Sequence, residues 1–234
     1  MAGKLYGIGI GPGDPELLTL KAVRLIRACP VAAVPGNDPL QTVAYRITVQ
    51  AVPELKEKEL LPVPMPMTKD AAALEASHEA GADLIEAELK KGKDVAFLTL
   101  GDPTIYATYL YVHKKIAARG YETEIVSGIP SFCAVAARLN IGIAEKSEQI
   151  HVIPASYQIE DALKLSGTKI LMKAGSKMQR VKETMLDLGL DGWMIENCGM
   201  PDEAIYRSAE EIPEKAGYYS LIIVKEKEKK CSIS

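Results

Sequence analysis

Cysteines are few in this chain of 234 residues, and the four that occur (Cys29, Cys133, Cys198 and Cys231) are scattered. None forms a C-x-x-C pair, and no histidine lies at zinc-ligand spacing from another ligand. A disulfide framework and a structural zinc site are therefore not predicted. Sparse, unpaired cysteines are typical of a reduced cytoplasmic protein. We expect that location and no bound metal.

The chain also lacks a strong charge of either sign. Its 28 Lys and Arg residues stand against 31 Asp and Glu residues, which leaves a formal net charge of −3. This balance argues against nucleic acid as the main partner. No apolar stretch approaches the length of a membrane span, and glycines interrupt the run near the N-terminus. We expect neither nucleic acid nor membrane as a partner.

Glycine is concentrated near the N-terminus, in Leu5-Tyr-Gly-Ile-Gly-Ile-Gly-Pro-Gly-Asp-Pro-Glu16. An apolar strand here would run into a glycine turn, and Asp14 followed by Pro15 is typical of a helix start. α/β proteins use such junctions to bring backbone N–H groups close to a ligand. The dinucleotide fingerprint G-x-G-x-x-G is broken, because Pro12 or Asp14 stands where its third glycine would be. No acidic residue closes the apolar run at 31–34, which also weighs against a nicotinamide dehydrogenase.

Apolar runs and helix signals alternate along the whole chain. We predict strands over residues 5–10, 31–34, 54–61, 94–100, 122–126, 149–153, 168–173, 192–196, 204–207 and 218–225, and helices over 17–28, 40–51, 69–91, 104–118, 131–139 and 176–188. Closely spaced strands near the end indicate an antiparallel portion. The fold class is therefore α/β, with a mainly parallel sheet in a domain of residues 1–120 and a mixed sheet in a domain of residues 121–234.

The tripeptide Gly-Asp-Pro occurs after two predicted strands, at 13–15 and at 101–103. Parallel strands end at one edge of a sheet, where open α/β proteins bind ligands, so both turns are expected to face one site. Gly101 would let the backbone approach a ligand, and Asp102 could accept N–H groups or lie near a cation. The alternative is a simple turn in which Asp102 caps the next helix.

Four motifs follow one another in an order that carries a resemblance. They are Gly7-x-Gly9-x-Gly11-Pro-Gly-Asp-Pro-Glu-Leu-Leu-Thr-Leu-Lys21, Gly101-Asp-Pro103 with Tyr106, Ser127-Gly-Ile-Pro-Ser-Phe-Cys-Ala134 and Leu171-Met-Lys-Ala-Gly175. Together they resemble the tetrapyrrole (corrin/porphyrin) methylase family, whose members use S-adenosylmethionine. Asn197-Cys-Gly-Met-Pro201 adds to the similarity with those members that methylate C-20 of precorrin-2 or cobalt-factor II in cobalamin biosynthesis.

The resemblance implies two α/β domains with S-adenosylmethionine in the cleft between them, a tetrapyrrole substrate and a homodimer. Carried over position by position, it assigns the cofactor contacts to Pro12, Leu100, Gly101, Asp102, Ile105, Ser131, Phe132, Met172, Cys198 and Gly199. Two of these have plainer interpretations. Met172 can be a core methionine on a buried strand, and Ser131 can cap its own helix.

Methyl transfer from a sulfonium requires little protein chemistry, because the donor is already activated. The enzyme has to hold the nucleophilic carbon in line with the methyl group and exclude water. A proton must then leave C-20, and Asp102 or Tyr106 is the predicted catalytic group that assists it. Alternative functions are another tetrapyrrole methylation, such as that of uroporphyrinogen-III, a protein-directed methyltransferase of the same fold, and a non-catalytic binding module.

Overall fold

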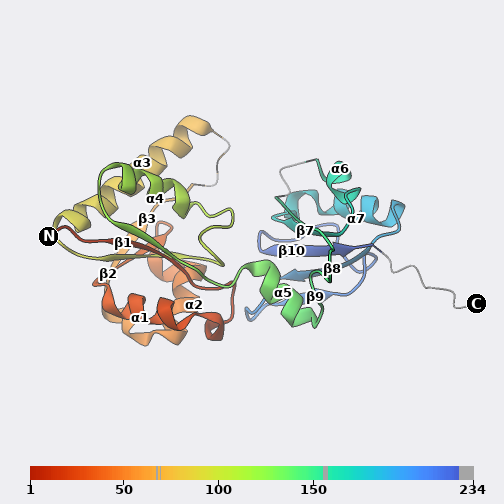
Figure 1. The fold of residues 1–234 in the computed structure, drawn as a ribbon, viewed down its shortest axis with the longest axis horizontal. Coiled ribbons are helices and arrows are strands. Elements are labelled where there is room, and N and C mark those ends of the chain that lie inside the picture. The colour runs from red at the N-terminus through yellow and green to blue at the C-terminus, as the bar shows by residue number, and fades with distance from the viewer. Residues whose placement is uncertain (67, 69, 155–157, 227–234) are drawn as a thin grey trace, which may run out of the picture. The chain divides into compact units, whose positions relative to one another are not determined.

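The computed structural model describes residues 1–66, 68, 70–154 and 158–226 and divides the chain into two compact units, Met1–Pro130 and Ser131–Ser234 (Figure 1). Each unit is built on one five-stranded sheet. The division comes after Pro130 and not after residue 120, because β5 (Thr123–Val126) pairs with β1 (Leu5–Gly9) in the first sheet.

The first sheet is entirely parallel, with strand order β3-β2-β4-β1-β5. Its other strands are β2 (Val31–Pro35), β3 (Glu59–Val63) and β4 (Val95–Thr99). Figure 1 shows α3 (Ala71–Lys90) and α4 (Tyr109–Ala118) on one face, and α1 (Leu20–Ala28) and α2 (Val43–Ala51) on the other. Every residue of β4 is buried, as expected for a central strand covered on both faces.

Two helices of this unit begin later than predicted, because a 3₁₀ turn precedes each of them. Asp14 accepts the Glu16 N–H at 2.8 Å and so caps the turn Pro15–Leu17, while the Thr19 hydroxyl accepts the Ala22 N–H and caps α1. The turn Pro39–Gln41 likewise precedes α2. Proline at the first position suits a short 3₁₀ turn as well as an α-helix, so the sequence signal is ambiguous.

The predicted strand at 54–61 is wrong over its first half. Residues Pro53–Glu57 form a 3₁₀ turn that starts at the proline, and the strand β3 occupies Glu59–Val63. Leu55 is completely buried within this turn. A single buried leucine among charged residues fits a turn as well as an alternating strand, which explains the error.

The second sheet is mixed, as predicted, with strand order β6-β7-β10-β8-β9. Its strands are β6 (Ile150–Pro154), β7 (Thr168–Met172), β8 (Asp191–Glu196), β9 (Ala204–Tyr206) and β10 (Ser220–Lys225). Only β6 and β7 pair in parallel. The helices are α5 (Ser131–Leu139), α6 (Ile159–Leu163) and α7 (Met178–Asp187), and α6 was not predicted because it is barely one turn long.

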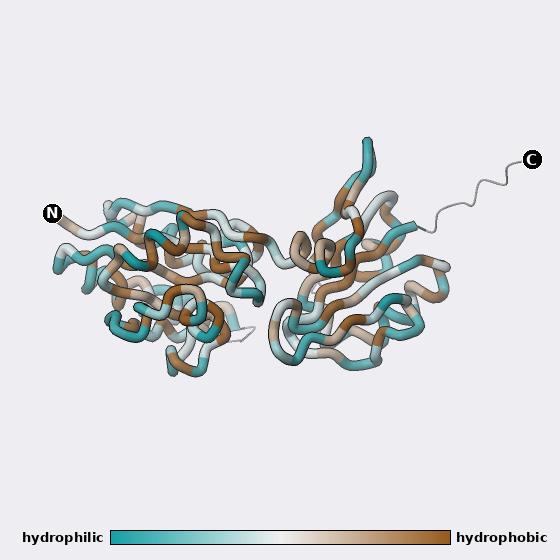
Figure 2. The backbone as a smooth tube through the Cα atoms, turned by 90° about the horizontal axis from the view of Figure 1, so that it is seen from below, coloured by the Kyte–Doolittle hydropathy of each residue, from teal (hydrophilic) through white to brown (hydrophobic). Residues whose placement is uncertain are grey.

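The buried apolar residues form a core within each unit. In Figure 2 the brown, apolar stretches run through the interior of both units, and teal segments gather mainly at their outer loops. In the second unit β10 separates two apolar clusters, since Ile222 and Val224 face one and Leu221 and Ile223 face the other. Successive side chains of β10 therefore point to opposite faces of the mixed sheet and contribute to the apolar cluster on each face.

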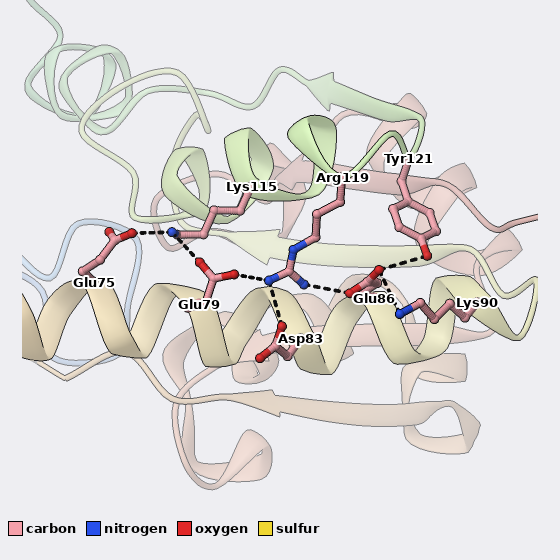
Figure 3. A network of polar contacts seen from close by, with 8 residues as sticks. All are labelled: Glu75, Glu79, Asp83, Glu86, Lys90, Lys115, Arg119 and Tyr121. Carbon is pink, nitrogen blue, oxygen red and sulfur yellow. Dashed lines mark hydrogen bonds and ion pairs between the residues drawn. The ribbon is translucent and has the colours of Figure 1, made fainter.

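A polar network fastens α4 to α3 (Figure 3). Arg119, directly after α4, pairs with three carboxylates of α3. Lys115 on α4 pairs with two, and the network extends to Lys90 and Tyr121. The acidic residues are Glu75, Glu79, Asp83 and Glu86. Single exposed pairs contribute little, but several charges shared around one half-buried guanidinium form a stable arrangement. This network holds the helix that directly follows the loop after β4.

A second ion cluster ties β5 to the elements around β1. Glu124 binds Lys21 at 2.7 Å and Lys4 at 2.8 Å. These two ammonium groups, first Lys21 and then Lys4, lower the pKa of Glu124 from its ordinary 4.5 to about 2. A depressed carboxyl pKa stabilises the fold at pH values above the ordinary pKa, and this stabilisation is lost as the pH falls toward the folded value.

We therefore predict that Glu124→Gln lowers the midpoint of thermal unfolding at neutral pH. The difference from the parent protein should shrink as the pH falls from 4.5 to about 2, because protonation removes the same charge from the parent. Glu122→Gln, on an exposed residue just before the strand, is the matched control and should leave the midpoint nearly unchanged. A Glu124→Gln deficit that stays constant across this range would contradict the assignment.

Candidate functional site

The loops that follow β1 and β4 meet at the carboxyl edge of the parallel sheet. The Ile10 N–H donates to the Thr99 carbonyl at 3.0 Å, and the Gly101 N–H donates to the Gly11 carbonyl at 2.8 Å. Gly11 and Gly101 form an isolated antiparallel β-bridge, and both have left-handed φ values, 74° and 68°. Both Gly-Asp-Pro turns therefore lie at one edge of the sheet, as expected from their positions after parallel strands.

Gly9 lies beneath a third loop as well, the one that follows β5. A Cβ added to Gly9 would lie 2.5 Å from the Gly128 nitrogen and 2.7 Å from the Gly101 carbonyl oxygen. Real Cβ atoms do not tolerate such distances to backbone atoms. The close approach of two loop backbones, and not an unusual φ, is what requires glycine at this position.

The Asp102 side chain is only 8% exposed and is occupied by hydrogen bonds within the protein. Its Oδ2 accepts the Gly128 N–H at 3.0 Å. Its Oδ1 accepts the Thr104 N–H at 2.8 Å and the Thr104 hydroxyl at 2.5 Å. The predicted alternative holds only for the local turn: Asp102 does not cap the next helix, because α4 (Tyr109–Ala118) begins at Tyr109. Its bond to Gly128 links two loops that are distant in sequence.

Tyr106 is half-exposed, at 49%, and has a left-handed backbone with φ of 47°. Such a conformation costs a non-glycine residue roughly 1–3 kcal/mol, and residues of this kind cluster at functional sites. Residues 104–108 belong to the loop, so α4 begins at Tyr109 and not at the predicted 104. The extra loop length is what places Tyr106 at the edge of the sheet.

The predicted positions of the first unit come together in these loops. Gly101 and Asp102 are buried, whereas Pro12, Leu100 and Ile105 are half-buried and retain some exposed surface. The predicted catalytic residues Asp102 and Tyr106 belong to the same loop. This edge therefore combines buried anchoring groups with partly exposed apolar side chains.

In the second unit the structure places three of the five predicted positions on one apolar cluster. Phe132 of α5, Met172 at the end of β7 and Cys198 after β8 are half-buried and pack against it. The cluster consists of Val135, Ala136, Leu139, Ile170, Ile195, Leu221 and Ile223. Strands β7 and β8 both run antiparallel to β10, so their carboxyl ends lie at one edge of the mixed sheet.

The turns that follow β7 and β8 both start with a left-handed residue that is not glycine. Lys173 has a φ of 60° and Asn197 a φ of 53°. The Asn197 amide donates to the Asp202 carboxylate at 2.8 Å, and the Gly199 N–H donates to the Glu203 carboxylate at 2.9 Å. These bonds fix the turn that contains Gly199. Ser131, half-buried, is the first residue of α5.

Sequence reasoning missed two buried hydroxyl groups at these edges. Thr99 Oγ1 at the end of β4 and Ser220 Oγ at the start of β10 have no hydrogen-bond partner within the described residues. The two residues are 7% and 3% exposed. An unpaired buried polar atom is costly, so a polar ligand at either edge would relieve it. A hydroxyl residue at the last or first position of an otherwise apolar strand was the available signal.

The described residues contain neither a metal-binding cluster nor a membrane-spanning helix. No group of three or more His, Cys, Asp or Glu side chains could hold a metal ion. None of the helices there combines the length and the apolar character that crossing a membrane requires.

Comparison with known proteins identifies a family and several relatives. Residues 4–213 match the family described as Tetrapyrrole (Corrin/Porphyrin) Methylases. The chain is 39% identical over 171 residues to a probable cobalt-precorrin-2 C(20)-methyltransferase of Methanocaldococcus jannaschii, covering 73% of this chain and 72% of the relative. It is 30% identical over 232 residues to the cobalt-precorrin-2 C(20)-methyltransferase of Salmonella typhimurium, covering 96% and 97% of the two chains.

A solved structure supports the fold. The uroporphyrin-III C-methyltransferase of Thermus thermophilus, complexed with S-adenosylhomocysteine, superposes with a TM-score of 0.69. It covers 96% of this chain and 98% of its own, at 20% identity. At this identity the likeness concerns the arrangement of strands and helices.

We predict that Gly9→Ala destabilises the protein by about 1–3 kcal/mol, because the added methyl group forces apart the loops containing Gly101 and Gly128. Chemical denaturation measures the change in free energy of unfolding. Gly142→Ala is the matched control, since a Cβ there meets no atom within 4 Å, and its effect should stay below about 1 kcal/mol. Equal effects of the two substitutions would refute the close approach at Gly9.

Proposed function

Because the chain belongs to the tetrapyrrole (corrin/porphyrin) methylase family, we propose that it transfers a methyl group from S-adenosylmethionine to C-20 of precorrin-2 or of its cobalt form in cobalamin biosynthesis. The observation that carries this proposal is the similarity, over most of the chain, to two relatives that are both named as C(20)-methyltransferases. The motifs that resemble this group lie at the carboxyl edges of both sheets. The proposal therefore draws on whole-chain similarity and on local geometry.

The residues of the first unit fit a bound S-adenosylmethionine. Pro12, Leu100 and Ile105 offer half-buried apolar surface beside the paired, buried glycines Gly11 and Gly101. The Thr99 hydroxyl, buried and without a partner among the described residues, would satisfy a polar group of the cofactor. The carboxyl edge of a parallel sheet is the usual ligand site of such folds.

The residues of the second unit fit the same cofactor in a different way. Phe132, Met172 and Cys198 form a half-buried apolar surface suited to a flat ring such as adenine. Ser131 and Gly199 complete the predicted set, and the fixed turn around Gly199 presents its backbone at the same edge of the sheet. The unpartnered Ser220 hydroxyl adds a polar group there.

S-adenosylmethionine supplies an activated methyl group when it is bound. What remains for the protein is to orient the attacking carbon, exclude water and remove the C-20 proton. The tied loops of the first unit provide a rigid frame for orientation. Tyr106, a half-exposed residue with a left-handed backbone in the loop after β4, is the group that we propose to assist the loss of the proton.

The substrate carries many carboxylates, so its binding surface should include cations. Lys173 is exposed at the end of β7, with its Nζ 5.6 Å from the centre of the Tyr218 ring. Arg138 pairs with Glu203 at 2.7 Å and thus has a carboxylate already. We name Lys173 as a candidate for a substrate carboxylate because it is exposed at the carboxyl end of β7. A homodimer, implied by the resemblance, and a cytoplasmic location, expected from the sparse cysteines, complete the proposal.

The direct test is incubation of the purified protein with S-adenosylmethionine and either precorrin-2 or cobalt-factor II, followed by mass spectrometry. The expected product has gained one methyl group. A protein that binds S-adenosylmethionine but methylates neither ring would favour the protein-directed alternative. Methyl transfer to uroporphyrinogen-III alone would favour the other tetrapyrrole reaction.

We also predict that Tyr106→Phe lowers kcat roughly a hundredfold while leaving the affinity for S-adenosylmethionine unchanged, because the ring and its backbone stay and only the hydroxyl is lost. Steady-state kinetics and calorimetric titration measure the two quantities. Tyr111→Phe, on an exposed tyrosine of α4, is the matched control. It should keep the parent's kcat and the parent's affinity for S-adenosylmethionine. Unchanged kcat in Tyr106→Phe would remove Tyr106 from the mechanism.

A further inference from the structure

The Asp102 carboxylate spans the end of β1. The strands β4 and β5 lie on opposite sides of β1 and do not touch each other in the sheet. Asp102 follows β4 and Gly128 follows β5, yet Asp102 Oδ2 accepts the Gly128 N–H at 3.0 Å. The bond closes the two flanking loops over Gly9, whose missing side chain leaves room for them.

This carboxylate has little capacity left for another partner. It accepts three hydrogen bonds, one from Gly128 and two from Thr104, out of roughly four that a carboxylate can accept. Hydrogen bonds to an ionised acceptor are about twice as strong as neutral ones, and burial strengthens them further. Protonating Asp102 would weaken all three bonds at the moment of reaction.

We infer that Asp102 is a positioning residue and does not take the C-20 proton: it holds the Gly101 loop and residues 127–130 in the arrangement that binds S-adenosylmethionine. This inference rests on the proposed function and assigns within it the role of one residue. The two predicted catalytic groups thus receive different roles. Asp102 positions the loops, and Tyr106, in the exposed part of the same loop, remains the group that contacts the reacting atoms.

The anchored segment also leads to predicted cofactor residues of the second unit. Residues 127–130 run directly into Ser131 and Phe132 at the start of α5. Gly128 is buried, and its N–H has the Asp102 carboxylate as its acceptor. If the Asp102 acceptor is lost, the buried Gly128 N–H has no partner. The cost of this unpaired donor favours a displacement of residues 127–130.

The first variant is Asp102→Asn, which keeps the size of the side chain but has only one acceptor oxygen. Its NH₂ group must face either the Gly128 N–H or the Thr104 N–H, so one bond is replaced by a repulsive contact. We expect the dissociation constant for S-adenosylmethionine to rise roughly tenfold or more. The shape of the pH profile of kcat should be unchanged, because no proton acceptor has been removed.

A matched pair at Thr104 tests the same support without touching the carboxylate. Thr104 is exposed, so its replacement leaves the core intact. Thr104→Val removes the hydroxyl that donates to Asp102, whereas Thr104→Ser retains it. Thr104→Val should weaken S-adenosylmethionine binding several-fold, and Thr104→Ser should restore it. This pair carries the test if Asp102→Asn fails to fold.

The inference is overturned if Asp102→Asn binds S-adenosylmethionine as tightly as the parent while kcat falls and the acidic limb of its pH profile disappears. It is equally overturned if Thr104→Val and Thr104→Ser bind the cofactor alike. Failure of the proposed function has a different signature, because the parent protein itself would then bind no S-adenosylmethionine or methylate no tetrapyrrole.

Discussion

The closure of two loops over Gly9 is the constraint on which the first unit's site depends. The backbone at Gly101 and at Gly128 approaches Gly9 so closely that no side chain fits there. A bridge from Gly101 to Gly11 and a carboxylate bond from Asp102 to Gly128 hold the closure in place. Three loops from three adjacent strands thus form one connected edge, and the candidate cofactor residues lie on it.

The two units hold the loops at the carboxyl edges of their sheets in different ways. In the first, glycines permit close backbone contact and a buried carboxylate fastens the loops. In the second, an apolar cluster beneath Phe132 and Met172 supports the edge, and the non-glycine residues Lys173 and Asn197 adopt left-handed turns after β7 and β8. Backbone strain of this kind persists only where the surrounding structure over-determines it, which is common at binding sites.

The regular elements were largely predictable from the sequence, because apolar runs such as the one at β4 have no other stable place than a buried strand. The predictions were wrong where a local sequence signal is compatible with two different structures. Pro15 and Pro39 start 3₁₀ turns as readily as helices, and α6 is too short to show a period. The division of the chain was misplaced because β5 joins a sheet whose other strands precede residue 120, and strand pairing is not visible in local pattern.

The meeting of the two Gly-Asp-Pro loops at one edge of the sheet was predictable from the sequence, but the side-chain contacts within these loops were not. Motifs placed Leu100, Gly101 and Asp102 beside the first glycine turn, and the pairing of Gly101 with Gly11 agrees with that placement. No pattern in the sequence connects Asp102 with Gly128, which follows a different strand. Nor does any pattern show that the Thr99 and Ser220 hydroxyls lack partners within the described residues. Such contacts arise only when the chain folds.

The chemistry of methyl transfer explains why a rigid edge serves the proposed reaction. The methyl donor is reactive by itself, so rate and regiochemistry depend on where the ring carbon is held. The most direct test uses S-adenosylmethionine labelled with ¹³C in its methyl group, with precorrin-2 or cobalt-factor II as acceptor, and locates the label in the product by NMR. The account predicts a single labelled methyl on C-20. A label on any other ring carbon would contradict it.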